Sequence, residues 1–154
     1  MTELNAAVKA RIVLNFLTTA HKRINSMPLK ELQRKYTANK GKRIRIIFKD
    51  ADRAVIIQFT GGEMKLSWLN RDYDVTARLT LDTLLNVADR HIKQLDLRTN
   101  CPVLVPYTTL DAFIRGDIDT EGDASTNDIK IAIEALADHI DVLKELLKGV
   151  KRNA

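Results

Sequence analysis

Four acidic residues, spaced two apart, are the side chains of this sequence whose pattern could do chemistry. They lie in FIRGDIDTEGDAS, residues 113–125, at Asp117, Asp119, Glu121 and Asp123, with Gly122 before the last of them. Alternating carboxylates with a glycine at the sixth position are typical of the calcium-binding loop between two helices. The same spacing is typical of a strand whose acidic side chains all face solvent, because side chains alternate between the two faces of a strand.

Two details favour the strand over the calcium loop. Counting from Asp117, the fifth position is Glu121, where the shorter Asp or Asn is usual, and the twelfth is Asp128 in place of a bidentate Glu. We therefore predict a strand over DIDTEG, with Ile118 and Thr120 on one face and the carboxylates in solvent, where charge discourages edge-to-edge pairing. No metal site is predicted.

No other motif points to a reaction. The sequence has a single cysteine, Cys101, and three histidines, His21, His91 and His139, which fall on three different predicted helices without ligand spacing. It has no glycine-rich phosphate loop and no nucleophile beside a recognisable base. We therefore predict a non-catalytic protein that uses no cofactor.

The composition is that of one globular domain, for which we expect a cytoplasmic location. The chain has 154 residues, 45% of them hydrophobic and 29% charged, and no apolar run approaches the ~20 residues that span a bilayer. The start, MTELNAAVKARIVLNFL, lacks the basic region and uninterrupted apolar stretch of a signal peptide. A single cysteine leaves no internal disulfide, which suits a reducing compartment.

The charge is distributed unevenly along the chain. Residues 1–49 carry 12 basic and 2 acidic residues, a net charge of +10, whereas residues 50–154 carry a net charge of −5. The basic third is predicted to face an anionic membrane or another partner through Lys9, Arg11, Lys22 and Arg23. Nucleic acid is a further candidate, although aromatic residues for base stacking are scarce, at 5%. The acidic remainder of the same chain is an equally good partner for these cations.

Periodicity predicts helices, then strands, then helices. A stripe with alternating steps of four and three predicts a helix over residues 4–26, and a second helix follows Pro28 at about 29–36. Alternation then predicts four strands joined by short turns, an antiparallel meander with one face in water, in KRIRIIF, AVIIQF, EMKLSW and YDVTARLT.

The second half is predicted to be mostly helical. Helices are expected over residues 81–92, capped by Thr80 or Asp82, over 108–116 with Gly116 as C-cap, and over 126–148 as one long helix. Residues 93–106 carry two prolines and no clear period, which predicts a long loop. The fold class is therefore α+β, with a mostly antiparallel four- to five-stranded sheet packed against helices.

Two segments of the sequence resemble the sterol carrier protein type-2 domain. They are DYDVTARLTLDTLLNVAD and LDAFIRGDIDTEGD, and the element order is similar over roughly residues 40 to 140. The residues that match the family pattern are Asp74, Val75, Thr76, Ala112, Phe113, Gly116, Gly122 and Asp123. The basic N-terminal helices and the heptad-spaced last helix resemble the bacterial accessory proteins of ubiquinone biosynthesis. Residues 89–107 are longer than the usual connection, and the last helix lacks the Gly-Leu pair that often follows the final motif.

This resemblance implies a sheet backed by helices around a lipid-sized tunnel. It divides the chain into a basic helical segment at 1–40, a sterol-carrier-like domain at 41–148 and a frayed tail at 149–154. The function that it implies is binding, transfer or presentation of a fatty acyl, isoprenoid, quinone or sterol-like molecule. The implied lining residues are Val55, Ile57, Phe59, Met64, Leu66, Trp68, Val75, Ala77, Leu79, Leu85, Leu110, Phe113, Ile114, Ile133 and Leu136, with Val103 and Leu104 as a lid.

The same residues are also consistent with an ordinary filled core, because periodicity does not separate a core from a cavity. The protein would then be an assembly or interaction subunit. The two heptad stripes, at 6–27 and 129–147, pack within the fold, on a second copy as a homodimer, or on an enzyme of a lipid pathway.

Overall fold

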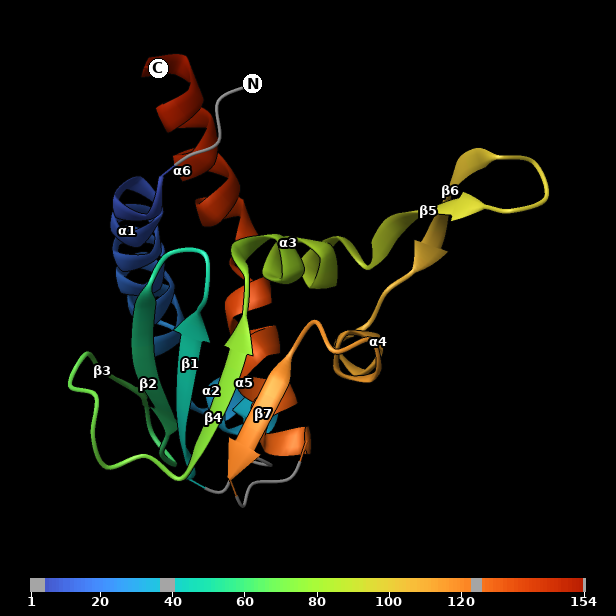
Figure 1. Ribbon diagram of the computed structural model, residues 1–154. Coiled ribbons are helices and arrows are strands. Elements are labelled where there is room, and N and C mark those ends of the chain that lie inside the picture. Colours follow the sequence, from blue (N-terminus) through green and yellow to red (C-terminus); the bar gives the residue numbers. More distant parts are fainter. Residues whose placement is uncertain (1–4, 37–40, 123–125, 154) are drawn as a thin grey trace.

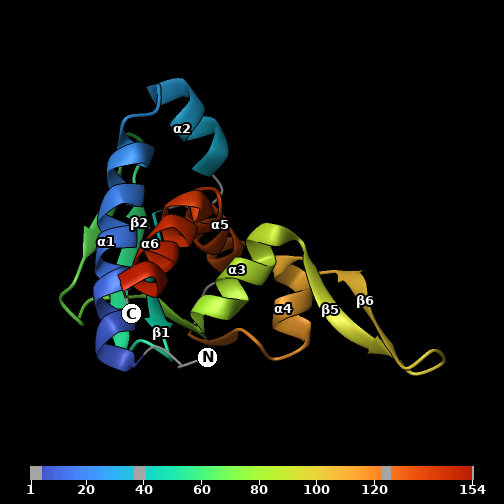
Figure 2. The ribbon, with the colours of Figure 1, turned by 90° about the horizontal axis from the view of Figure 1, so that it is seen from above.

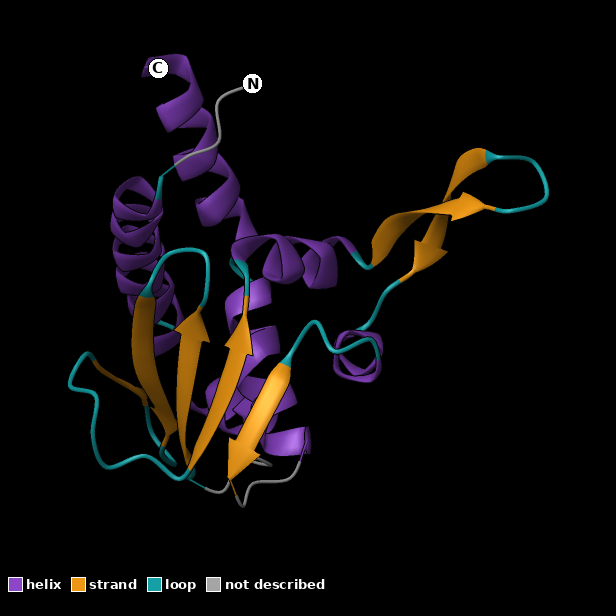
Figure 3. Ribbon diagram, in the orientation of Figure 1, coloured by secondary structure: helices purple, strands orange, loops and turns teal. Residues whose placement is uncertain are grey.

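The computed structural model describes residues 5–36, 41–122 and 126–153. The fold is α+β, as the sequence predicts: helices cover one face of a five-stranded sheet, and a separate two-stranded hairpin projects from the body (Figures 1 and 3). Viewed from above, the hairpin points away from the sheet and from the helices (Figure 2).

The sheet has the order β3-β2-β1-β4-β7. Its strands are β1 (Arg43–Phe48), β2 (Arg53–Phe59), β3 (Met64–Ser67), β4 (Val75–Leu79) and β7 (Asp119–Gly122). The four alternating segments are therefore strands, as predicted, but the predicted meander is wrong. β4 does not follow β3 in the sheet; it returns to pair with β1 in parallel. The physical reason is burial: Val75, Thr76 and Ala77 are all buried, so both faces of β4 are covered, which suits an interior strand.

β7 confirms the strand predicted in the acidic stretch, at the edge of the sheet beside β4. Ile118 and Thr120 are predicted to share one face, away from the solvent-facing carboxylates. Ile118, just before the strand, is buried as that implies, but Thr120 is exposed, so the prediction is wrong for Thr120. The carboxylates separate, since Asp117 accepts a hydrogen bond from the Tyr107 hydroxyl and Glu121 pairs with Arg78 at 3.0 Å. Asp123 lies outside the described residues.

Helix α1 (Ala6–Asn25) lies along the sheet, and α2 (Leu29–Tyr36) follows it, close to the predicted limits. The Asn5 side chain caps α1 by accepting from the Val8 amide at 2.9 Å. The buried residues include most of the predicted stripe, and Ile12 and Phe16 widen it. The wider apolar face lets α1 pack against both the sheet and the C-terminal helix.

The predicted single C-terminal helix is two helices, α5 (Thr126–Ala137) and α6 (Ile140–Asn153), so part of the predicted frayed tail is helical. At the break, backbone hydrogen bonds join residues three apart, as in a 3₁₀ turn. The His139 amide donates to the Leu136 carbonyl and the Val142 amide donates to the His139 carbonyl, each at 3.1 Å. α5 packs against α3 and α4, and α6 packs along α1 (Figure 2). The spacing of apolar residues is the same on both sides of the break between α5 and α6, because each helix buries one face. The two faces pack against different neighbours.

The predicted loop at 93–106 is a β-hairpin of β5 (His91–Asp96) and β6 (Cys101–Pro106), and the helix before it, α3 (Leu81–Asp89), ends at Arg90. The Tyr107 amide donates to the Arg90 carbonyl across the hairpin at 2.8 Å. Backbone amides point alternately toward and away from the partner strand. Pro102 and Pro106 occupy positions at which the amide would point away from β5, so the missing N–H groups of these prolines remove no hydrogen bond between β5 and β6.

His139, at the break between α5 and α6, is expected to make stability depend on pH. Burial lowers the pKa of His139 below its usual 6.5, aided by the charges of Arg23 and Lys35 and opposed by those of Asp138 and Asp141. His139 therefore binds a proton more readily in the unfolded chain than in the folded chain. Its contribution to the free energy of unfolding is fully present above pH 6.5 and is lost as the pH falls through the lowered pKa of the folded state.

Urea denaturation between about pH 8 and pH 5 measures this effect. The variant His139→Gln is expected to have a flatter dependence over that window than the unmodified chain. His91→Gln, in the exposed hairpin, is the matched control and should keep the slope. Identical slopes for all three proteins would contradict the assignment to His139.

Candidate functional site

The predicted cavity residues of the sheet lie together on its inner face, but in a filled core. They are at most 3% exposed: Val55, Ile57, Phe59, Met64, Val75, Ala77 and Leu79. Ile133 and Leu136 of α5 face them in the same hydrophobic core. Packing at this density stabilises the fold, and the role of these residues in binding a ligand remains a prediction.

The other predicted lining residues are more exposed and more dispersed. Leu66 and Leu85 are half-buried, and Trp68 lies just after β3 with 38% of its surface exposed. In α4 (Thr109–Ile114), Phe113 is half-buried, whereas Leu110 and Ile114 are exposed. The lid candidates Val103 and Leu104 are exposed on β6.

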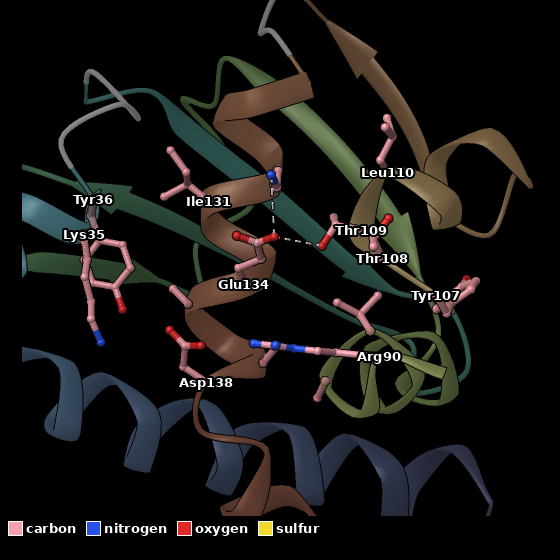
Figure 4. A pocket seen from close by; sticks show the side chains of 15 residues that line it. Lys35, Tyr36, Arg90, Tyr107, Thr108, Thr109, Leu110, Ile131, Glu134 and Asp138 are labelled. Carbon is pink, nitrogen blue, oxygen red and sulfur yellow. Dashed lines mark hydrogen bonds and ion pairs between the residues drawn. The ribbon is translucent and has the colours of Figure 1, made fainter. Parts of the chain in front are cut away.

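A cleft of about 730 Å³ opens on the other side of α5, between α2, α3 and α4 (Figure 4). Ile131 and Glu134 of α5 face the cleft, as does Asp138 just after the helix, whereas Ile133 and Leu136 belong to the hydrophobic core. α5 therefore separates the filled core from the cleft. The lining residues are Lys35, Tyr36, Val87, Ala88, Arg90, Tyr107, Thr108, Thr109, Leu110, Lys130, Ile131, Glu134, Ala135, Ala137 and Asp138.

The apolar part of the lining comes from three helices. Val87 and Ala88 project from α3, Leu110 from α4, and Ile131 and Ala135 from α5. The alanines leave space because their side chains end at Cβ. This surface can bury an aliphatic or isoprenoid chain by the hydrophobic effect.

One wall of the cleft is held by the start of α4. Thr108 caps this helix, its hydroxyl accepting from the Asp111 amide at 3.1 Å while the Asp111 carboxylate accepts from the Thr108 amide. The next residue, Thr109, is buried and donates its hydroxyl to Glu134 at 3.3 Å. Lys130 lies 3.9 Å from the same carboxylate, so Glu134 is positioned by both α4 and its own helix (Figure 4).

Tyr36 closes the end of the cleft formed by α2. Its ring stacks on Phe59 with the centroids 4.4 Å apart. Burial raises the pKa of the Tyr36 phenol to about 12, and the negative charges of Asp138 and Glu31 act in the same direction. The hydroxyl is therefore protonated at neutral pH, and it points toward Asp138 in Figure 4, where it can donate a hydrogen bond to a ligand.

Arg90 supplies a positive charge from the opposite end. It follows α3 in the left-handed conformation, with φ of 65°, and its amide caps the helix by donating to the Asn86 carbonyl. Figure 4 shows its side chain extending along the cleft toward α5. The cleft thus combines an apolar wall with cationic and carboxylate groups, an arrangement that suits an amphiphile with a polar or anionic end.

Two of the four cations predicted to face a membrane or partner are paired within the chain. Lys9 lies 3.5 Å from Asp50, and Arg23 lies 2.8 Å from Asp141. Arg11 and Lys22 are exposed on α1. The acidic remainder of the chain is therefore one real partner of the basic N-terminal third.

The cleft itself was not predicted from the sequence, apart from Leu110. Its residues come from segments that lie between Lys35 and Asp138, and Tyr36, Arg90 and Glu134 belong to no shared motif. One local signal existed: Ile131 and Ala135 lie off the heptad stripe of the last helices, which indicates a second apolar face on α5.

Comparison with known proteins gives similarity to solved structures only. No family model matches the chain, and no curated protein matches it. Within the described residues, no helix is both long and apolar enough to cross a membrane.

Three solved structures illustrate the similarity. A protein described as "UbiJ-SCP2 Ubiquinone synthesis protein" is 20% identical, with a TM-score of 0.49, over 79% of this chain and 88% of that one. Sterol Carrier Protein 2 Like 2 from Aedes aegypti is 16% identical, with a TM-score of 0.40, over 83% and 95%. A sec-alkylsulfatase from Pseudomonas sp. is 22% identical, with a TM-score of 0.43, over 66% of this chain and 14% of that one. Each of these three structures is at most 22% identical to this chain.

Proposed function

We propose that this protein binds, and carries or presents, a hydrophobic small molecule with a polar or anionic end, without transforming it. The observation that supports this most is the cleft of about 730 Å³, whose apolar wall ends at Arg90 and Tyr36. This volume lies within the roughly 300–1,000 Å³ of small-molecule sites. Fatty acyl, isoprenoid and quinone-like molecules share the required chemistry.

The apolar wall supplies most of the affinity in this proposal. Each methylene transferred from water contributes about 0.8 kcal/mol, so eight contribute about 6 kcal/mol before the cost of association. Arg90 would orient the ligand by pairing with its anionic end, and the protonated Tyr36 hydroxyl would donate to an oxygen of that end.

A second candidate function is that of an interaction subunit. The filled interface between sheet and helices favours it, as do the exposed leucines of the hairpin. This candidate requires no ligand in the cleft, so ligand binding distinguishes the two functions.

Mass spectrometry of the purified full chain tests the proposal. Under native conditions we expect a mass increment in stoichiometric amount, and organic extraction should release a molecule with an aliphatic or isoprenoid chain. If the protein carries none, it should take up added fatty acid or quinone. A protein without bound lipid that takes up neither would contradict the proposal and favour the interaction subunit.

A further inference from the structure

The β5–β6 hairpin projects from the body of the protein with apolar side chains in water. It extends away from the sheet and the helices in two perpendicular views (Figures 1 and 2). Leu97, in the connecting turn, is 91% exposed, and Leu104 of β6 is 66% exposed. Leu95 and Val103 are exposed on the same hairpin. Leu97 lies in the turn, Leu95 near it, and Leu104 opposite Lys93 in the middle of the hairpin. Several exposed leucines along one projection indicate a contact surface, because single scattered leucines would need no explanation.

Cations accompany these leucines. Lys93 and Arg98 are exposed on the hairpin, and Arg115, which follows α4, donates to Gln94 at 3.1 Å. The acidic residue of the hairpin, Asp96, is used within the turn, where its carboxylate accepts from the Arg98 amide and the Thr99 hydroxyl. The projection is therefore apolar and positively charged, which is complementary to an anionic bilayer surface.

The edges of the hairpin do not favour addition of a partner strand. Two of the three outward amide positions of β6 are occupied by Pro102 and Pro106, so that edge lacks most of its donors. On β5, Lys93 occupies the middle of the free edge, and a charged edge residue also discourages pairing. A contact made by the side chains of the turn and faces is favoured over strand pairing.

We propose that the β5–β6 hairpin docks on anionic membranes, inserting Leu97 and Leu104 among the lipids while Lys93 and Arg98 contact the headgroups. Long cationic side chains can reach the headgroup level while neighbouring apolar side chains enter the bilayer surface. Arg90 lies at the base of the hairpin and also lines the cleft, so the hairpin connects the docking surface to the cleft. The link between docking and a bound hydrophobic molecule rests on the proposed function. The evidence for docking itself does not.

Sedimentation of the full chain with vesicles tests this surface. We expect binding to phosphatidylcholine vesicles that contain phosphatidylserine, and weaker binding at high salt or without the anionic lipid. The double variant Leu97→Gln, Leu104→Gln should lower the partition coefficient by about tenfold or more, because two leucines no longer enter the apolar region. Arg98→Gln should lower it by roughly fivefold on the anionic vesicles.

Matched controls lie on the opposite side of the molecule. Leu69→Gln removes a leucine after β3 that is 60% exposed, close to the 66% of Leu104, and Lys65→Gln removes an exposed cation of β3. Neither should change vesicle binding. Equal binding by the hairpin variants and the unmodified chain would overturn the proposal, as would absence of binding to anionic vesicles. Hairpin-dependent self-association without vesicles, measured by light scattering, would instead assign the surface to a second copy.

Ligand uptake distinguishes failure of this proposal from failure of the proposed function. Vesicle binding by a protein that takes up no fatty acid or quinone would support the docking surface and contradict only the cargo. Fatty-acid uptake that persists in a protein without vesicle binding would contradict only the docking surface.

Discussion

The double variant Leu110→Gln, Ile131→Gln is expected to bind a fluorescent fatty acid roughly 30- to 150-fold more weakly than the unmodified protein. Both side chains line the apolar wall of the cleft, from α4 and α5. Replacing two apolar contacts by amides removes about 2–3 kcal/mol of burial free energy. Fluorescence titration measures the dissociation constant, and a urea unfolding curve verifies that the variant is folded.

Two comparisons refine this test. Ile114→Gln is the matched control, because Ile114 is exposed on the same helix as Leu110 but does not line the cleft. Arg90→Gln should weaken binding of a fatty acid by about tenfold but leave the corresponding fatty alcohol almost unaffected, since only the acid is charged. Arg53→Gln, an exposed arginine at the start of β2, serves as its control.

Unchanged fatty-acid binding by the double variant would contradict the cleft as the ligand site. If Ala77→Leu then abolished binding without lowering the unfolding midpoint, the ligand would occupy the sheet–helix interface, as the sequence resemblance implies. Ala77 has no exposed surface, so an added side chain there fills any space that opens between the sheet and α5.

Gly122→Ala is expected to lower the free energy of unfolding by about 3 kcal/mol or more. Gly122 ends β7 with φ of +115°, a conformation that costs a residue with a Cβ roughly 1–3 kcal/mol. An added Cβ would also lie 2.8 Å from the Asp74 carbonyl oxygen and 3.0 Å from the Val75 Cα. Both are backbone atoms at the start of β4 or just before it, so relief requires β4 and β7 to separate.

Two other glycines separate the backbone cost from the steric cost. Gly116→Ala has φ of +79° but no atom within 4 Å of the added Cβ, so it should carry only the conformational cost of about 1 kcal/mol. Gly61→Ala meets no atom within 4 Å, and no positive φ constrains it, so its effect should be small. Urea denaturation of the three variants measures their losses in the free energy of unfolding, which should decrease from Gly122→Ala to Gly116→Ala to Gly61→Ala. Equal losses of stability in Gly116→Ala and Gly122→Ala would contradict the steric contribution assigned to Gly122.

Alternation and helical spacing predicted which residues turn inward, because burial along a single strand or helix follows its own period. Ile44, Ile46 and Phe48 alternate with half-buried neighbours in β1, and their pattern needs no knowledge of the rest of the chain. The strand within the acidic stretch was predicted for the same reason. The α+β class and the resemblance to the sterol carrier proteins also followed from local motifs.

Pairing and direction depended on contacts between distant segments. Strand periodicity is the same whether β4 lies beside β3 or beside β1, and only burial of both of its faces in the assembled sheet distinguishes them. The heptad stripe likewise passes through His139 unchanged, although α5 and α6 pack on different neighbours.

The cleft shows the same limit at the level of function. Tyr36, Arg90, Leu110 and Glu134 have no common spacing, and they meet because α2, α3 and α4 end or cross around one face of α5. The sequence alone also did not distinguish a filled core from a cavity, since both require the same apolar residues. That difference is one of packing density, which depends on how closely the side chains of separate elements interlock.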